Sequence, residues 1–244
     1  MAILEGRNPV IEAIKNEREI DKILVANSAK EGSIKKIIAM ANEKNIIIQY
    51  VDRHKLDEVS TSHSHQGVIA YVSEHKYWEL DDLIASVKQK GEDPFFIILD
   101  EITDPHNLGS IIRTADAVGA HGVIIPKRRS VNITPVVVKA SAGAVEYVPV
   151  CKVTNIVNTI KRLKEEGLWI AAADMDGETF YEQNLTGSLG LVIGSEGFGI
   201  SRLVKQNCDF TVKMPMIGNV TSLNASVAGG ILLYEIFKQR LNKK

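Results

Sequence analysis

The chain reads Phe95-Phe-Ile-Ile-Leu99, then Asp104-Pro-His-Asn-Leu-Gly-Ser-Ile-Ile-Arg113, then Val123-Ile-Ile125. The first and third runs are short and apolar, which predicts buried strands. Between them, Leu108, Ile111, Ile112 and Ala115 recur at helical spacing and predict a helix. A strand, a helix and a second strand in this order are typical of a parallel sheet covered by helices.

The same alternation continues to the end of the chain. We expect further strands over 145–150, 168–173, 189–193 and 210–214, a helix opened by Thr134-Pro135, and a last helix over about 223–238. Parallel sheets are buried on both faces because their crossover helices cover them. The prediction for residues 94–244 is therefore an α/β domain with a mostly parallel sheet and helices on both faces.

Residues 1–75 alternate in the same way over a shorter length. We expect a helix from Asn8-Pro9 to Ile14, a strand over 21–25, a helix capped by Ser33, and strands over 46–51 and 67–72. The polar stretch 76–93, with a helix-like run over 80–90, suits a connection between domains. The predicted organisation is a small α/β domain over 1–75, a linker over 76–93 and the larger domain over 94–244.

The composition is that of an ordinary globular protein, with 244 residues of which 45% are hydrophobic and 24% are charged. No run approaches the roughly 18 apolar residues of a membrane span, and the N-terminus lacks the pattern of a secretory signal. We therefore expect a cytoplasmic protein without a membrane partner. The net charge of −1 gives no support to nucleic-acid binding, although a local basic patch would still permit it.

Cysteine and histidine spacing argues against a disulfide framework and against a metal site. Cys151 and Cys208 are isolated from each other and form no Cys-x-x-Cys pair. His63, His65 and His75 have no carboxylate or cysteine at a recognisable ligand spacing. We expect no bound metal and interpret the histidines as parts of polar loops.

Polar residues follow three of the predicted strands, at the point where each strand ends. The three blocks are Asn107-Leu-Gly-Ser-Ile-Ile-Arg113, Gly194-Ser-Glu-Gly197, and Pro215-Met216 followed by Ser222-Leu-Asn-Ala-Ser226. Ligands of open α/β sheets bind beyond the carboxyl ends of the strands. The blocks therefore predict a single candidate site.

Helix capping explains part of these blocks. Asp104 and Pro105 suit a capped helix start, and Ser222 suits the cap of the last helix. Capping explains neither Arg113, beside an apolar stripe, nor Glu196, just past a buried strand. The glycine loop at 194–199 is not a dinucleotide fingerprint, because its order is G-x-x-G-x-G and no acidic residue follows at the required distance.

In order and spacing, the three blocks resemble the signature motifs of the SpoU (TrmH-like) family of RNA ribose 2'-O-methyltransferases. Gly6-Arg-Asn-Pro-Val10 and His65-Gln-Gly-Val68 resemble the RNA-binding N-terminal domain of many members. The resemblance implies a deep trefoil knot in the larger domain, which the rarity of knots would not suggest. It also implies an N-terminal domain similar to the L7Ae/L30e proteins, and a homodimer whose active sites use residues of both subunits.

The resemblance implies roles for individual residues. The catalytic positions would be Asn107, Arg113, Glu196, Ser222 and Asn224, and S-adenosylmethionine would be held by Gly194, Met214 and Leu223. Because an arginine side chain stays protonated, Arg113 would bind the phosphate of the target and stabilise a developing alkoxide rather than act as the base. Expected RNA contacts are Arg7, in the N-terminal motif, and the basic run Lys127, Arg128 and Arg129, just past a strand end.

The expected activity is S-adenosylmethionine-dependent methylation of a ribose 2'-hydroxyl, on a guanosine of 23S ribosomal RNA. The same reaction on tRNA and a non-catalytic RNA-binding role are the alternatives, and an oxidoreductase would lack its phosphate fingerprint. We expect Ala228, Gly229 and Gly230 to permit close packing in the homodimer. We also expect a bulky residue at Gly194 to abolish cofactor binding and leave the fold intact.

Overall fold

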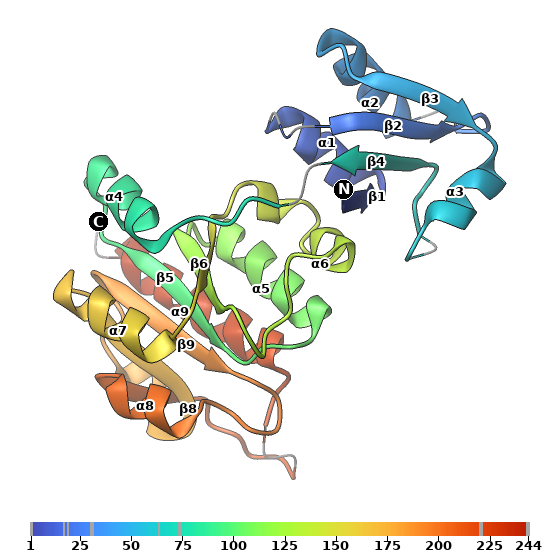
Figure 1. Ribbon diagram of the computed structural model, residues 1–244. Coiled ribbons are helices and arrows are strands. Elements are labelled where there is room, and N and C mark those ends of the chain that lie inside the picture. The colour runs from blue at the N-terminus through green and yellow to red at the C-terminus, as the bar shows by residue number, and fades with distance from the viewer. Residues whose placement is uncertain are drawn as a thin grey trace. The chain divides into compact units, whose positions relative to one another are not determined.

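Six parallel strands form the larger of two sheets, in the spatial order β10-β8-β9-β5-β6-β7 (Figure 1). The strands are β5 (Phe95–Asp100), β6 (Gly122–Pro126), β7 (Val150–Val153), β8 (Trp169–Thr179), β9 (Leu189–Gly194) and β10 (Phe210–Lys213). β5 lies inside the sheet and is buried along its whole length. The predicted α/β architecture with a parallel sheet is confirmed.

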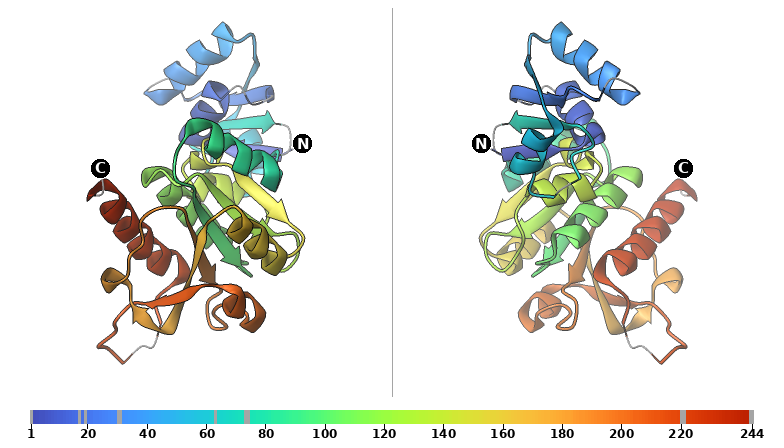
Figure 2. Two further views of the ribbon diagram at one scale, coloured as in Figure 1. Left: turned by 90° about the vertical axis from the view of Figure 1, so that its left-hand side faces the viewer. Right: turned by 90° about the vertical axis from the view of Figure 1, so that its right-hand side faces the viewer.

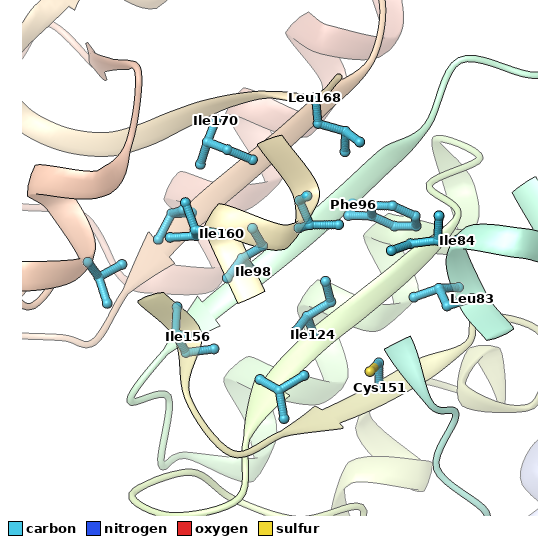
Figure 3. Close-up of a cluster of buried hydrophobic side chains, with 14 of the residues drawn as sticks. Leu83, Ile84, Phe96, Ile98, Ile124, Cys151, Ile156, Ile160, Leu168 and Ile170 are labelled. Atoms are coloured by element: carbon cyan, nitrogen blue, oxygen red, sulfur yellow. The ribbon is translucent and has the colours of Figure 1, made fainter. Parts of the chain in front are cut away.

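Helices cover both faces of this sheet, as expected. On one face, buried residues of α4 (Leu80–Lys90), α7 (Ile156–Glu165) and α8 (Arg202–Asn207) belong to one hydrophobic cluster that also contains Phe96 and Ile98 of β5. Figure 3 shows much of this cluster. On the other face α5 (Pro105–Ala117) and α9 (Ala225–Asn242) contact each other (Figure 2). Because side chains alternate along a strand, the neighbouring Phe95 reaches that second layer, where its ring lies 5.4 Å from the guanidinium carbon of Arg240.

The structure, a computed structural model, describes residues 2–16, 18, 20–29, 32–62, 64–72, 75–219 and 222–242. The chain divides into two units. The first consists of Met1–Lys76 and Asn132–Tyr147, and the second of Tyr77–Val131 and Val148–Lys244. Within the described ranges no helix is long and apolar enough to span a bilayer.

The first unit is built on a four-stranded sheet of order β1-β4-β2-β3, in which only the β2–β3 pair is parallel. Its elements are β1 (Ala2–Glu5), α1 (Arg7–Lys15), β2 (Ile20–Ala26), α2 (Ser33–Glu43), β3 (Ile47–Val51), α3 (Arg53–Val59) and β4 (Val68–Val72). The expected strands and the first two helices are present, but Gly32 rather than Ser33 occupies the cap of α2. β1 and α3 were not expected from the sequence. α3 buries only Leu56, so it carries no apolar stripe that could have predicted it.

Residues 132–147 interrupt the second unit along the chain and belong to the first unit. They form α6 (Pro135–Ala140) and the short 3-10 helix η1 (Ala144–Glu146), and Glu146 makes a buried ion pair of 2.6 Å with Arg18. The strand expected over 145–150 is wrong, since pairing begins only at Val150. Positive φ angles at Ala142 (53°) and Gly143 (93°) turn the chain into η1 before it can extend.

The stretch 76–93 is likewise more than a connection. The expected helical run is α4, and its Leu83, Ile84 and Val87 are buried in the core of the second unit. Trp78 pairs with the larger sheet through its backbone N–H, which donates to Val150 O at 2.9 Å. The structure therefore places residues from 77 onward with the second unit rather than in a linker.

A buried carboxylate fixes the turn between α3 and β4. Glu5 is 1% exposed and accepts hydrogen bonds from Ser60 Oγ at 2.6 Å, from the Thr61 backbone N–H at 2.7 Å and from the Ser62 hydroxyl. Burial alone raises the pKa of the Glu5 carboxyl, but the hydrogen bonds from Ser60, Ser62 and Thr61 outweigh it and lower that pKa to about 2. Because the folded pKa lies below the ordinary glutamate value of 4.5, this stabilisation is present above about pH 4.5 and is lost as the pH falls toward 2.

We predict that Glu5→Ala lowers the free energy of unfolding by about 2–3 kcal/mol at pH 7, because several donors lose a charged acceptor. Glu43→Ala, at an exposed position of α2, is the control and should change it by less than about 0.5 kcal/mol. Urea unfolding at pH 7 and pH 3 measures both. The deficit of Glu5→Ala should shrink at pH 3, and a constant deficit would contradict the role of the carboxylate.

Candidate active site at the carboxyl ends of β5 and β9

The candidate site lies at the carboxyl ends of β5 and β9, two neighbouring parallel strands whose following connections lead to opposite sides of the sheet. β5 and β9 pair along their whole length and end together, with Asp100 opposite Gly194. From β5 the chain continues to β6 on one side, whereas from β9 it continues to β10 on the other. Such a reversal opens a crevice beyond the carboxyl ends of the strands, where α/β proteins bind ligands.

Three polar side chains meet in this crevice through hydrogen bonds. Glu196 Oε1 accepts from Asn107 Nδ2 at 2.9 Å, from the backbone N–H of Ala225 at 3.3 Å, and from Asn224 Nδ2. Asn224 Nδ2 also donates to Asn107 Oδ1 at 2.9 Å. The structure thus brings together three of the five expected catalytic residues, one from each sequence block. We call these three residues the amide–carboxylate cluster.

Asn224 serves a second purpose as the cap of α9. Its Oδ1 accepts hydrogen bonds from the backbone N–H groups of Ser226 at 3.0 Å and Val227 at 3.2 Å. The interpretation of Ser222 as the cap is therefore wrong; Ser222 lines the neighbouring pocket instead. A carboxamide can accept on one side and donate on the other, which explains why asparagine occupies this position.

The glycine loop after β9 is a tight, internally paired turn. Ser195 N–H donates to Gly199 O at 3.0 Å, and Gly199 N–H donates to Ser195 O at 2.9 Å. Beyond the turn, the backbone N–H of Ser201 donates to Asp100 Oδ2 at 2.7 Å. Asp100 is 5% exposed and was not among the expected site residues, although an acidic residue directly after the strand at 95–99 was a readable signal.

The packing of the loop requires glycine at position 194, whether or not a ligand is bound. A Cβ at this position would lie 2.2 Å from the backbone carbonyl carbon of Gly199, which is far inside van der Waals contact. The expectation that a bulky residue here leaves the fold intact is therefore wrong, because the loop would have to move. Loss of binding in a Gly194 variant would report on the loop and not on a ligand contact alone.

A pocket of about 480 Å³ opens beside the amide–carboxylate cluster. All three expected cofactor-binding residues line it, namely Gly194, Met214 and Leu223, together with Glu196 and Ser222. Its buried wall is apolar and consists of Ile193, Val212 and Ala225. An apolar cavity of this size with a few convergent polar groups is typical of a small-molecule site.

Arg113 is not part of the cluster in this chain. It lies on α5 six residues after Asn107, so it is rotated by about 240° around the helix and displaced by about 9 Å along it. Its side chain is exposed, and the structure gives it no hydrogen bond or ion pair with any described residue. The expectation that Arg113 faces the same point as Glu196 and Asn224 is therefore wrong for a single chain.

The expected RNA-binding residues are spread over both units. In the second unit Lys127, Arg128 and Arg129 are exposed just past β6, and Arg129 makes an ion pair of 3.0 Å with Glu101. In the first unit Arg7 holds the turn before β4, since its Nε donates to Gln66 O at 3.2 Å. Arg7 therefore has a structural role in this turn, independent of any contact with RNA.

The described histidine and cysteine side chains do not form a metal site. His65 is buried, lies 2.9 Å from Asp57 through Nε2, and accepts from Gly67 N–H through Nδ1 at 3.0 Å, while His63 falls outside the described residues. Cys151 and Cys208 are free thiols. Across the described ranges, no three His, Cys, Asp or Glu side chains are grouped as metal ligands.

Comparison with known proteins identifies the same two parts of the chain. Residues 94–234 match the model of the SpoU rRNA Methylase family, and residues 3–78 match a model described as RNA 2'-O ribose methyltransferase substrate binding. The Bacillus subtilis protein "Putative TrmH family tRNA/rRNA methyltransferase YacO" is 52% identical over 237 residues, which cover 96% of this chain and 94% of that relative. A Staphylococcus saprophyticus protein of the same family name is 48% identical over 98% of this chain and 96% of its own length.

Among solved structures, the chain resembles the SpoU methyltransferase AviRb from Streptomyces viridochromogenes, crystallised with AdoMet. The TM-score is 0.82 at 26% identity, and the match covers 98% of this chain and 90% of AviRb. The similarity therefore extends over both units.

We predict that Asn224→Asp keeps the cap of α9 but disrupts the amide–carboxylate cluster, because the new carboxylate replaces a donor and faces Glu196. The free energy of unfolding at pH 7 should fall by about 1–3 kcal/mol, and the loss should lessen below about pH 4 as carboxyl groups protonate. Asn158→Asp, an exposed change on α7, is the matched control. An equal effect of the two changes at pH 7 would mean that the donor side of Asn224 contributes nothing.

Proposed function

This chain belongs to the SpoU rRNA Methylase family of RNA methyltransferases, and we propose that it methylates a ribose 2'-hydroxyl, on a guanosine of 23S ribosomal RNA, with S-adenosylmethionine as the methyl donor. The observation that carries the proposal is the convergence of Asn107, Glu196 and Asn224 beside an apolar pocket. The family model is described for ribosomal RNA, while the relatives are named for tRNA or rRNA. Methylation of tRNA is therefore the alternative.

The pocket suits S-adenosylmethionine, the ligand crystallised with AviRb. Ile193, Val212 and Ala225 offer an apolar wall for a purine, and the backbone at Gly194, Met214 and Leu223 would hold the polar groups. Glu196 places a carboxylate at the pocket, which is favourable for a cationic ligand. When bound, S-adenosylmethionine supplies a methyl group made electrophilic by its sulfonium.

Within this site the residues have distinct tasks. Asn107 and Asn224 hold Glu196 in one orientation, so the mouth of the pocket is preorganised before RNA arrives. Arg113 binds a phosphate of the target nucleotide and stabilises negative charge on the 2'-oxygen as its proton leaves to phosphate or water. Ser222, at the rim of the pocket, helps to position the ribose.

Within one chain the exposed Arg113 lies on a different face of α5 from Asn107 and makes no hydrogen bond to the cluster, so we propose that a second copy of the chain presents it. We therefore propose a homodimer. α9 carries an exposed apolar stripe of Val227, Ile231 and Tyr234, which are 51%, 42% and 53% exposed and lie on one helical face. This stripe forms the proposed contact. Of the small residues expected there, Gly229 packs within its own chain, since a Cβ at this position would lie 2.9 Å from Ile193, and Ala228 lines the pocket. Nothing lies within 4 Å of a Cβ at Gly230, which therefore still permits close packing of a second chain.

The first unit is proposed to select the RNA. Its match to a substrate-binding model and the pinned turns at Glu5 and Arg7 support a preformed surface that would bind structured RNA. Lys127 and Arg128 would add phosphate contacts from the second unit. The trefoil knot and the likeness to L7Ae/L30e proteins remain predictions from the family.

We predict that the protein transfers tritium from methyl-labelled S-adenosylmethionine to unmodified 23S ribosomal RNA transcripts of Bacillus subtilis and not to tRNA transcripts. Arg113→Ala should lower kcat by on the order of 100-fold and leave the Kd for S-adenosylmethionine unchanged. Arg113→Lys should rescue poorly, because a point charge does not reproduce the fork of a guanidinium. Nuclease digestion to nucleosides identifies the methylated position.

Lys161→Ala, which removes one exposed positive charge on α7, is the control and should retain full turnover. Label found only in tRNA would establish the alternative substrate. Cofactor binding without methylation of either RNA would indicate the non-catalytic role. Near-normal turnover of a folded Arg113→Ala variant would exclude Arg113 from the reaction.

We predict that the wild type sediments as a dimer, at about twice the chain mass of 26.8 kDa, and that Ile231→Glu sediments as a monomer at micromolar concentration, because a charge is placed in the apolar stripe. The monomer should lose methyl transfer together with dimerisation. Leu203→Glu, at an exposed apolar residue of α8, is the control and should stay dimeric. A monomeric and fully active wild type would rule out the shared site.

A further inference from the structure

Phe198 is the most exposed aromatic side chain in the described part of the second unit, at 94% exposure. Aromatic side chains are usually buried, since each can remove a large apolar area from water. Phe198 stands at the tip of the glycine loop and lines the same pocket as Glu196 and Ser222. An unusually exposed aromatic side chain thus lies directly at the candidate site.

The loop holds Phe198 in this position by its backbone. Gly197 and Gly199 on either side have φ angles of 84° and 66°, a region that L side chains rarely adopt. The paired backbone of Ser195 and Gly199 closes the turn, and Asp100 fixes the chain just beyond it through Ser201. The aromatic ring is therefore presented to solvent by a constrained turn and not by a loose segment.

The inner part of the pocket does not depend on this ring. Its apolar wall, formed by Ile193, Val212 and Ala225, is at most 6% exposed. Phe198 lies at the outer rim, where a larger molecule approaches. The ring is thus better placed for the second substrate than for a ligand seated against the wall.

We propose that Phe198 stacks on the base of the nucleotide whose ribose is methylated. This inference rests on the proposed function. A base is bonded to C1' of its ribose, next to C2', so a 2'-hydroxyl brought to the mouth of the pocket carries its base to the rim. Stacking on an exposed aromatic side chain is a general way for proteins to hold an unpaired base.

The consequence is a positioning contact that does not read the sequence. Every base presents a π-face, so a single aromatic platform tolerates all four. Phe198 would hold the nucleotide out of its helix while other contacts choose which nucleotide it is. Its removal should therefore weaken RNA use without changing which position is methylated.

The first test compares Phe198→Ala with Phe198→Trp in the full chain. Phe198→Ala should lower kcat/KM for the 23S transcript by about 10-fold or more, and Phe198→Trp should stay within about threefold of the wild type. The Kd for S-adenosylmethionine from calorimetry and the sedimentation of both variants should be unchanged. Trp169→Ala, at an exposed aromatic residue on the opposite, amino end of β8, should leave all three quantities unaltered.

The second test does not require turnover. With p-benzoylphenylalanine at position 198, irradiation should link the protein to the methylated transcript, or to 23S RNA if none is methylated; the same group at position 169 should not. A link to the second subunit instead, or an equal loss of cofactor affinity in Phe198→Ala, would overturn the proposal. Failure of wild-type methylation together with a position-198 link to RNA would refute the proposed activity and not the base contact.

Discussion

A single oxygen atom, Glu196 Oε1, holds together segments that are far apart in the sequence. It accepts from Asn107 at the start of α5, from Asn224 just before α9 and from the backbone of Ala225 in the first turn of α9. An ionised carboxylate is acceptor-only, and hydrogen bonds to it are stronger than those between neutral groups. The first turns of α5 and α9, the two helices on one face of the sheet, are therefore both hydrogen-bonded to Glu196. This shared contact helps to fix the walls of the pocket.

The two asparagines transmit this constraint because each has a donor and an acceptor. Asn224 caps α9 with its oxygen while its nitrogen reaches the cluster. Asn107 accepts from Asn224 and donates to Glu196. A carboxylate could only accept, and a hydroxyl, which donates and accepts through one atom, is too short to span both partners. The residue types in the three sequence blocks thus follow from hydrogen bonding among themselves, before any substrate is considered.

Local patterns in the sequence were sufficient to predict the parallel sheet and the place where the polar residues of the candidate site meet. The apolar runs at 95–99 and 189–193 are strands because they are buried on both faces, and the polar residues after them meet because parallel strands end at one edge. The residue type of Arg113 suggested a place in the cluster, but the spacing argued against it: six residues separate it from Asn107 on one helix, so the two side chains lie on different faces. Nor did any local signal show that residues 132–147 pack with the first unit, because that outcome depends on long-range contacts such as the Arg18–Glu146 pair.

The discontinuity of the first unit has a consequence for how the protein is made. Synthesis proceeds from the N-terminus, and domains commonly fold as they emerge. Here the first unit lacks α6 and η1 until the chain has been extended through Tyr147, by which time two strands of the larger sheet, β5 and β6, have already been translated. The partner of Arg18 arrives 128 residues after it. The first unit therefore cannot be completed until part of the second unit has been synthesised.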